Sequence, residues 1–268
     1  MNKLFYKYQG TGNDFILFDD REGKFPAQDK ALIARLCHRR FGIGADGLIL
    51  FQITAEGMPY MQYFNSDGAE STMCGNGGRC FSRFLVDLKA ADNKLEFLAI
   101  DGPHQALVKE NALVSLQMKN VDAVEKVDER TFVLNTGSPH YVKFINQLIT
   151  TLDVVEAGRS IRYSERFAEQ GINVNFVQKM EDGSLAVRTY ERGVEDETYS
   201  CGTGVTAAAI ALSELEPREF PHHAVRLGTP GGALRVSYQR ENGVISDVWL
   251  EGPAVMVFQG VVELSEGE

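Results

Sequence analysis

The sequence predicts an α+β fold built from two strand-rich halves, each with one long helix. Short β-rich runs bounded by Gly or Asp-Gly recur along the whole chain. Only a few segments have helical spacing of apolar residues. The two clearest of these begin with the same pattern, a Cys followed by Gly-x-Gly. A doubly wound parallel sheet would instead alternate strands and helices regularly.

The predicted strands follow the β-branched and aromatic runs, and most are bounded by turn residues. In chain order they cover residues 4–8, 15–18, 48–53, 61–64, 95–100, 113–118, 132–135, 141–144, 173–178, 185–190, 224–227, 234–238, 244–250 and 255–262.

Three helices are predicted from apolar residues that recur on one face. They cover residues 31–39, 75–88 and 202–215, and the third is rich in alanine. A fourth, polar helix is predicted at residues 160–170.

The two Cys-Gly-x-Gly elements indicate an internal duplication. Cys74 and Cys201 lie close to half a chain length apart in the 268 residues, and each follows an acidic, Gly-containing loop. We expect a first half at residues 1–119, completed by a C-terminal strand at 253–268, and a second half at 120–252. The polar, charged segment at residues 120–129 would divide the two copies.

Composition excludes several classes of function. The chain has 27 Lys+Arg against 37 Asp+Glu, a formal net charge of −10, and no basic stripe, so nucleic acid and anionic membranes are not expected partners. Four cysteines are too few for a disulfide framework. No export signal and no apolar run of transmembrane length is evident, which predicts a cytoplasmic protein with reduced thiols.

The paired cysteines carry the predicted chemistry. A Cys at a helix start meets unpaired backbone N–H groups and the positive end of the helix dipole, which favour the thiolate. Gly75, Gly77, Gly202 and Gly204 let an anionic ligand such as a carboxylate approach those N–H groups. A thiolate and a thiol on opposite faces of one carbon would transfer protons in both directions and invert a stereocentre.

Other interpretations of these residues are weaker. Cys37 and Cys80 lie within helical segments and are expected in the core. A zinc site of Cys74, Cys80 and His140 lacks the usual ligand spacing, and no C-x-x-C motif indicates a disulfide catalyst. The Gly-rich segments match neither common phosphate-loop pattern, and no lysine stands out as a pyridoxal-phosphate anchor.

A set of motifs, in order along nearly the whole chain, resembles the diaminopimelate epimerase family. They are GTGNDF (10–15), GIGADG (42–47), FNSDGAE (64–70), MCGNGGR (73–79), GSPH (137–140), NVNF (173–176), YERG (190–193) and SCGTG (200–204). The resemblance implies a cofactor-independent epimerase that interconverts LL- and meso-2,6-diaminopimelate for lysine and peptidoglycan precursors. It also implies two pseudo-symmetric α/β halves, each a curled, mostly antiparallel sheet around a central helix, a site in the cleft between them, and a homodimer.

The resemblance also assigns roles to single residues. Cys74 and Cys201 match the family's acid/base pair, and His140 and Glu191 match residues that tune the cysteine pKa values. The matches to substrate-binding residues are Asn13, Asn65, Gly75, Asn76, Asn173, Glu191, Arg192, Gly202 and Thr203. Arg192 and the amides suit the distal amino acid end of the substrate, because together they bind a carboxylate and an ammonium group. No metal site is implied.

The sequence departs from the family pattern in three places. Gly47 stands where Gln is usual, Ser138 stands where Asn is usual, and an additional residue between Glu191 and Cys201 predicts a bulge at residues 194–197. The first two remove side-chain contacts to substrate. They leave open a racemase of another amino acid, such as histidine, on the same scaffold. A non-catalytic small-molecule binding protein is a further alternative.

Overall fold

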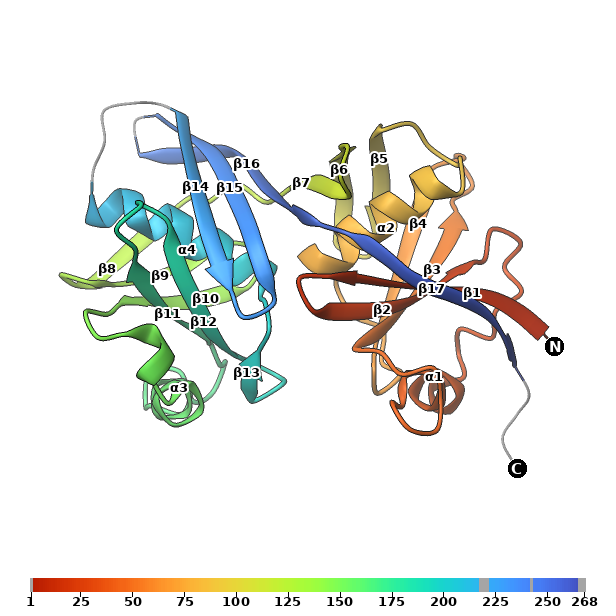
Figure 1. Ribbon diagram of the computed structural model, residues 1–268, viewed down its shortest axis with the longest axis horizontal. Coiled ribbons are helices and arrows are strands. Elements are labelled where there is room, and N and C mark those ends of the chain that lie inside the picture. The colour runs from red at the N-terminus through yellow and green to blue at the C-terminus, as the bar shows by residue number, and fades with distance from the viewer. Residues whose placement is uncertain (1, 217–221, 242, 265–268) are drawn as a thin grey trace. The chain divides into compact units, whose positions relative to one another are not determined.

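The computed structural model describes residues 2–216, 222–241 and 243–264. The chain forms two compact units, Met1–Leu116 with Pro253–Glu268 and Gln117–Gly252. The sequence predicts that the first unit ends at residue 119 and that the chain rejoins this unit at residue 253. Each unit contains strands wound about one central helix (Figure 1).

The first unit is a mixed sheet in which helices connect the parallel strands. Its elements are β1 (Asn2–Gly10), β2 (Asn13–Asp19), α1 (Lys30–Cys37), β3 (Gly47–Ile53), β4 (Pro59–Asn65), α2 (Gly75–Asp87), β5 (Lys94–Ala99), β6 (Gly102–Val108), β7 (Leu113–Gln117) and β17 (Val255–Glu263). The pairs β2–β3 and β4–β5 are parallel, and α1 and α2 connect them. The pairs β17–β1, β1–β2, β3–β4, β5–β6 and β6–β7 are antiparallel.

The second unit repeats this order. Its elements are β8 (Val124–Asp128), β9 (Thr131–Asn135), β10 (Pro139–Phe144), the 3-10 turn η1 (Ile149–Thr151), α3 (Val154–Arg162), β11 (Asn173–Lys179), β12 (Leu185–Glu191), β13 (Asp196–Thr198), α4 (Gly202–Leu215), β14 (His222–Thr229), β15 (Gly232–Glu241) and β16 (Val244–Pro253). Parallel pairs β10–β11 and β12–β14 are connected through α3 and α4, and the hairpins around them are antiparallel. The predicted α+β class with two pseudo-symmetric halves is confirmed.

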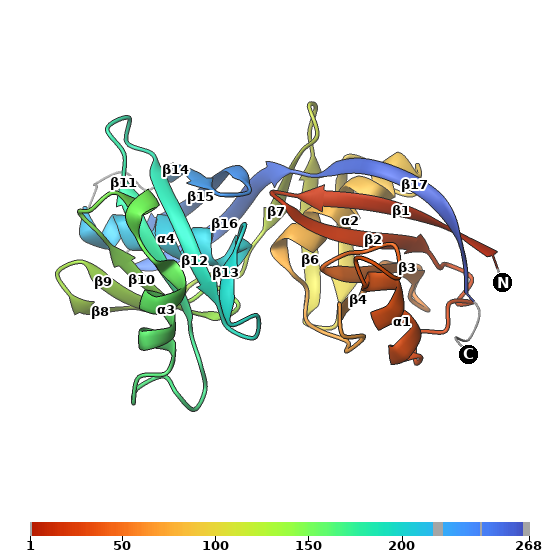
Figure 2. The same ribbon diagram turned by 60° about the horizontal axis from the view of Figure 1, so that its bottom comes forward.

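The central helices are buried because they carry apolar or small residues on nearly every side. In α4, the run from Val205 to Leu212 is entirely buried, as expected of a helix without a polar face. In α2, Phe81 and Phe84 pack edge-on against Phe51, with ring centroids 5.8 Å and 6.5 Å apart. The helix α1 lies beside β2 and β3 (Figure 2), and an apolar cluster joins the side chains of α1 to those of the two strands.

The predicted fourth helix is wrong in position. The helix α3 spans Val154–Arg162, and residues 163–170 form turns. The Asp153 side chain caps α3 by accepting a hydrogen bond from the Glu156 N–H. Gly158 lets the helix approach Tyr190, since a Cβ there would lie 2.4 Å from the Tyr190 Cβ. Two adjacent valines and Gly158 give α3 a low intrinsic helix propensity, so packing against Tyr190 stabilises this helix.

Three strands were missed by the sequence analysis: β6, β8 and β13. The segment at 120–129, expected as a polar divider, contains β8, which pairs with β9. Most of the β8 side chains are exposed, so the sequence of this strand lacks the alternation of apolar and polar residues that indicates a half-buried strand. The expected bulge at 194–197 is also partly wrong, because β13 pairs Asp196 with Glu191 and Glu197 with Tyr190.

No helix in residues 2–216, 222–241 and 243–264 is long and apolar enough to span a membrane.

Candidate functional site

Both predicted catalytic cysteines are the N-cap residues of central helices. Cys74 precedes α2 and Cys201 precedes α4, each with an extended backbone, at φ −91° and φ −109° respectively. Neither thiol hydrogen-bonds to the helix N–H groups as a capping side chain. Each cysteine therefore lies in a loop that faces the first N–H groups of its own helix and the positive end of that helix's dipole.

The candidate residues of the first unit are Asn13, Asn65, Cys74, Gly75 and Asn76, which we call the first-unit cluster, and all of them except Asn65 meet at the start of α2. The Asn13 Oδ1 atom lies 3.6 Å from Cys74 Sγ and accepts a hydrogen bond from Asn76 Nδ2 at 3.2 Å. Asn65, at the end of β4, is exposed and lies opposite Gly47 in the sheet register. The structure thus places amide groups from β2 and α2 around the Cys74 thiol.

Charged residues that the sequence analysis did not single out hold Asn13. Asp46 Oδ2 accepts from Asn13 Nδ2 at 2.6 Å, and Arg39 bridges Asp46 and Asp14 with contacts of 2.7 Å. Burial alone would raise the pKa of Asp14, but hydrogen bonds from Arg39 and Lys7 outweigh it and hold that pKa at about 2. Asp14 is therefore ionised at neutral pH, and the network orients Asn13 with its Oδ1 toward Cys74.

Arg79 is a second group that the sequence analysis left without a role. Its side chain is fully buried and donates to Asn76 Oδ1 at 2.9 Å, and to Gly75 O and Thr11 Oγ1 at 3.3 Å each. Burial lowers the pKa of Arg79, while the charges of Cys80 and Cys74 act in the opposite direction. The guanidinium therefore fixes the first turn of α2 and places a positive charge in the electrostatic reach of Cys74.

The position of Gly47 is filled by a neighbouring ring. A Cβ at Gly47 would lie 2.5 Å from Tyr63 Cε2 and 3.0 Å from the Tyr63 hydroxyl oxygen. Gly47 pairs with Phe15 on one side and with Asn65 on the other. The side chain that the family pattern places at position 47 is therefore replaced here by the Tyr63 phenol.

The candidate residues of the second unit are His140, Asn173, Glu191, Arg192, Cys201, Gly202 and Thr203, which we call the second-unit cluster. Cys201, Gly202 and Thr203 lie at the start of α4. Cys201 is buried and its Sγ lies 3.4 Å from Thr203 Oγ1. The Thr136 hydroxyl donates to Thr203 O at 2.9 Å, which ties the turn before β10 to the first turn of α4.

Asn173 connects the remaining predicted substrate-binding groups of this cluster. Its Oδ1 accepts from the Arg192 backbone N–H at 2.9 Å, and its Nδ2 donates to Ser138 Oγ at 2.7 Å. The Arg192 guanidinium donates to Gln170 O and is exposed, whereas Glu191 accepts from the Thr198 hydroxyl at 2.8 Å. Ser138 thus contacts Asn173 directly from the position where the family pattern has Asn.

His140 is fully buried on β10, and its ring Nδ1 lies 3.1 Å from Asn175 Nδ2. Burial, followed by the charge of Arg192, lowers the pKa of His140 from 6.5 to about 3. The ring is therefore neutral at physiological pH. Asn175 was quoted in a motif of the sequence analysis but given no role.

The other two cysteines lie in the core of the first unit. Burial raises the pKa of Cys37 and of Cys80 to about 12, so both are protonated at neutral pH. In the part of the chain that the structure describes, no group of three or more His, Cys, Asp or Glu side chains is placed to hold a metal ion.

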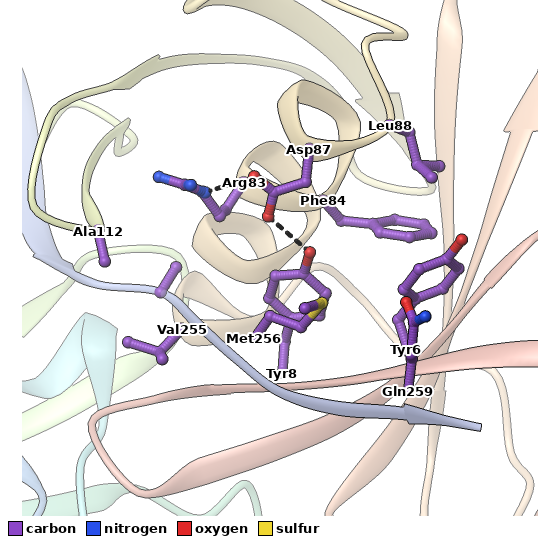
Figure 3. A pocket seen from close by; sticks show the side chains of 11 residues that line it. Tyr6, Tyr8, Arg83, Phe84, Asp87, Leu88, Ala112, Val255, Met256 and Gln259 are labelled. Carbon is purple, nitrogen blue, oxygen red and sulfur yellow. Dashed lines mark hydrogen bonds and ion pairs between the residues drawn. The ribbon is translucent and has the colours of Figure 1, made fainter.

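A cavity of about 590 Å³ lies at the other end of α2. Tyr6 and Tyr8 of β1, Phe84 and Asp87 of α2, and Met256 of β17 contribute to its walls (Figure 3). The Tyr8 hydroxyl donates to Asp87 Oδ2 at 2.7 Å, and Arg83 Nε donates to Asp87 Oδ1 at 2.9 Å. Asp87 is the last residue of α2 and Cys74 its N-cap, so this cavity is separate from the first-unit cluster.

Solved structures share this architecture. A PhzF-family phenazine biosynthesis protein from Bacillus anthracis superposes with a TM-score of 0.76 at 12% sequence identity, covering 98% of this chain and 100% of that chain. A hydroxyproline epimerase from Agrobacterium vitis superposes with a TM-score of 0.70 at 14% identity, covering 99% of this chain and 93% of that chain. The class defined here is therefore the two-unit α+β fold common to PhzF-family proteins and this epimerase.

Sequence comparison narrows the class. The diaminopimelate epimerase family model matches residues 5–124 and 132–257. A diaminopimelate epimerase from Flavobacterium psychrophilum is 50% identical over 257 residues, 96% of this chain and 99% of that protein. One from Archaeoglobus fulgidus is 37% identical over 99% of this chain and 98% of that protein. The chain belongs to the diaminopimelate epimerase family and is accordingly an isomerase.

Proposed function

We propose that this chain is a cofactor-independent epimerase that interconverts LL- and meso-2,6-diaminopimelate with Cys74 and Cys201 as its two bases. The reaction would serve lysine and peptidoglycan precursor biosynthesis. The observation that carries the proposal is the cysteine N-cap on the central helix of each unit, Cys74 on α2 and Cys201 on α4. The substrate is the one in the names of the relatives from Flavobacterium psychrophilum and Archaeoglobus fulgidus.

The proposed mechanism moves one proton on each face of the reacting carbon. One cysteine, as thiolate, removes the α-proton and becomes a thiol. The other, as thiol, donates its proton to the opposite face and becomes a thiolate, so charge and protons balance and the stereocentre inverts. The intermediate places negative charge on the substrate carboxylate. N–H groups at the starts of α2 and α4, including those of Gly75, Asn76, Gly202 and Thr203, would stabilise that charge.

Substrate recognition in this proposal depends on the unreactive end. The two ends of diaminopimelate are chemically identical, so the enzyme selects the reacting centre by holding the distal one. Arg192 would bind the carboxylate of the distal end. The carboxylate and ammonium groups of that end would also be bound by Asn13, Asn65, Asn173 and Glu191. The bond from the Arg192 N–H to Asn173 Oδ1 supports a shared role for these two residues. His140 and Glu191 would tune the two cysteines.

We further propose that the enzyme works as a cytoplasmic homodimer. The strand β17 pairs with β1, and most of its side chains are exposed, including Met256, Val257, Phe258 and Val261. An exposed apolar strand of this kind is suited to contact with a second copy. Catalysis through a free thiol and thiolate requires a reducing compartment.

The test is epimerisation in D2O without pyridoxal phosphate or added metal. Reduced, folded protein should convert LL-diaminopimelate to the meso form and incorporate deuterium at the inverted carbon. Cys74→Ala and Cys201→Ala should each abolish inversion, whereas Cys37→Ala, which removes a core thiol from the first unit, should retain it. The absence of turnover in the wild-type protein would refute the proposal. Racemisation of another amino acid instead, such as histidine, would refute the substrate assignment.

The same variants separate an enzyme from a binding protein. If the chain only binds its ligand, Cys201→Ala should leave affinity largely intact and no α-proton exchange should occur in any variant. One-sided exchange of the α-proton without inversion in either cysteine variant would support the two-base assignment, since a single base can still remove and return a proton on its own face.

A further inference from the structure

A buried polar cluster lies beneath the first turn of α4, and it adds Asn175 and Thr189, which have no role in the reaction proposed above, to His140. It consists of His140 on β10, Asn175 on β11 and Thr189 on β12, and all three side chains are buried. Asn175 lies directly against the helix, since a Cβ at Gly204 would be 2.3 Å from its Oδ1 atom. The cluster therefore connects the sheet to the helix that Cys201 caps.

The hydrogen bonds of Asn175 fix which way its amide points. Thr189 Oγ1 donates to Asn175 Oδ1 at 2.9 Å. Asn175 Nδ2 lies 3.1 Å from the Tyr141 carbonyl oxygen, which can only accept a hydrogen bond. A flipped amide would place two acceptors, Oδ1 and the Tyr141 oxygen, in contact. Asn175 therefore presents its NH2 group to β10.

That orientation determines the tautomer of His140. The second hydrogen of Asn175 Nδ2 faces His140 Nδ1 at 3.1 Å, so Nδ1 must be the acceptor. A neutral imidazole with an unprotonated Nδ1 carries its proton on Nε2. His140 is thus an Nε2–H donor, and burial together with the Arg192 charge keeps the ring neutral by lowering its pKa to about 3.

The Nε2 atom of His140 is buried and has no hydrogen-bond partner among residues 2–216, 222–241 and 243–264. A buried donor without an acceptor costs roughly 1–3 kcal/mol. Such groups are therefore uncommon unless a bound molecule or an ionised side chain supplies the acceptor. The charge of Arg192 reaches the same ring. An N–H donor that lies within the field of a positive charge favours an anionic acceptor.

We propose that Asn175 is a positioning residue that fixes His140 as the Nε2–H tautomer, so that the ring donates to an anionic group in the second-unit cluster. The anion is either a carboxylate of the bound substrate or the Cys201 thiolate. This proposal rests on the proposed function for the identity of the anion, but the tautomer itself does not depend on activity.

The tautomer is measured directly by 15N NMR of histidine-labelled protein. Wild-type His140, assigned by its loss in His140→Gln, should show a protonated Nε2 and an unprotonated Nδ1 from about pH 5 to pH 8. Asn175→Asp keeps the shape of the side chain but replaces the NH2 donor with an acceptor, so the proton should move to Nδ1. Because its tautomer is reversed, this variant should lose roughly 10- to 100-fold in kcat/KM, the range found when a residue that holds a histidine ring in orientation is replaced.

Thr189→Val is the matched control. It removes the hydrogen bond to Asn175 Oδ1 but leaves Nδ2 facing His140, so the Nε2–H tautomer should persist and kcat/KM should change by less than about threefold. A merely structural role for this cluster predicts similar losses in Thr189→Val and Asn175→Asp, with no change of tautomer. If Asn175→Asp does not fold, the wild-type spectrum alone decides the tautomer.

Two further titrations identify the anion. A change in the Nε2–H signal on adding diaminopimelate to Cys201→Ser assigns the acceptor as a substrate carboxylate. A change on raising the pH of the substrate-free wild type, absent from Cys201→Ser, assigns it as the thiolate. A proton on Nδ1 in the wild type, or no response to either titration, overturns the proposal. Failure of the epimerase assay with the tautomer as expected would instead refute the proposed function.

Discussion

The aromatic ring of Tyr63 occupies the space above Gly47, where a Cβ would lie 2.5 Å from Tyr63 Cε2. Ile49, not Gly47, is the direct partner of Tyr63 in the β3–β4 register, so the ring leans diagonally across β3 toward Gly47. Its edge also meets Phe15, with ring centroids 6.0 Å apart. The absence of a side chain at position 47 is therefore matched by a large one at position 63.

Gly47→Gln should destabilise the protein, because its Cβ overlaps both Tyr63 and the Phe64 carbonyl oxygen. We expect a loss of about 1–3 kcal/mol in the free energy of unfolding, typical of overpacking, measured by urea denaturation. Tyr63→Ala in the same chain should recover part of it. Gly228→Ala, whose Cβ would be 4.0 Å from the nearest atom, is the control and should have little effect. Equal losses in Gly47→Gln and Gly228→Ala would contradict this explanation.

Arg79→Met should make Cys74 less reactive. The buried guanidinium is in electrostatic contact with Cys74 and holds Asn76, and its removal leaves the thiolate with less positive charge nearby. The rate at which iodoacetamide alkylates Cys74 is measured across pH by peptide mass spectrometry. The midpoint of this pH profile should move upward by about one pH unit in the variant. Arg83→Met removes a charge paired with Asp87 further along the same helix, and it should not shift the profile. An identical shift in both variants would indicate a general effect on α2.

Stability should fall in mild acid because of His140. Its pKa is about 3 in the folded protein and near 6.5 when unfolded, so the unfolded chain binds a proton that the folded chain does not. The contribution of the neutral ring is complete above about pH 6.5 and is lost as pH falls toward 3. Between pH 6.5 and pH 5 this amounts to about 2 kcal/mol. Urea denaturation at each pH measures it, and His140→Gln should show a smaller slope over that interval. A slope equal to that of the wild type would show that other groups cause the loss.

Val257→Asp should weaken the proposed dimer. Val257 lies on β17 and is 56% exposed, and a charge there would have to be desolvated on contact with a second copy. Light scattering after size exclusion should show a dimer for the wild type and a lower mass for the variant. Leu148→Asp, at a residue of the second unit that is 64% exposed, should keep the wild-type mass. A wild-type monomer would refute the dimer itself.

The sequence by itself determined the fold class, the duplication and the two cysteine-capped helices. These features have local causes. Alternating apolar residues specify strands, and a Cys followed by Gly-x-Gly begins a helix at both Gly75 and Gly202. The motifs also contain the residues of the clusters around Asn13 and Asn173.

Tertiary structure decided what these patterns could not express. The helix α3 depends on the contact of Gly158 with Tyr190, and β8 depends on backbone pairing with β9, so neither leaves a clear periodic signal. Arg79 and Asn175 lay within quoted motifs, yet their importance comes from burial and from partners far along the chain, such as Thr11 and His140. Long-range hydrogen bonds and close packing depend on which surfaces meet, and the order of residues alone does not specify that.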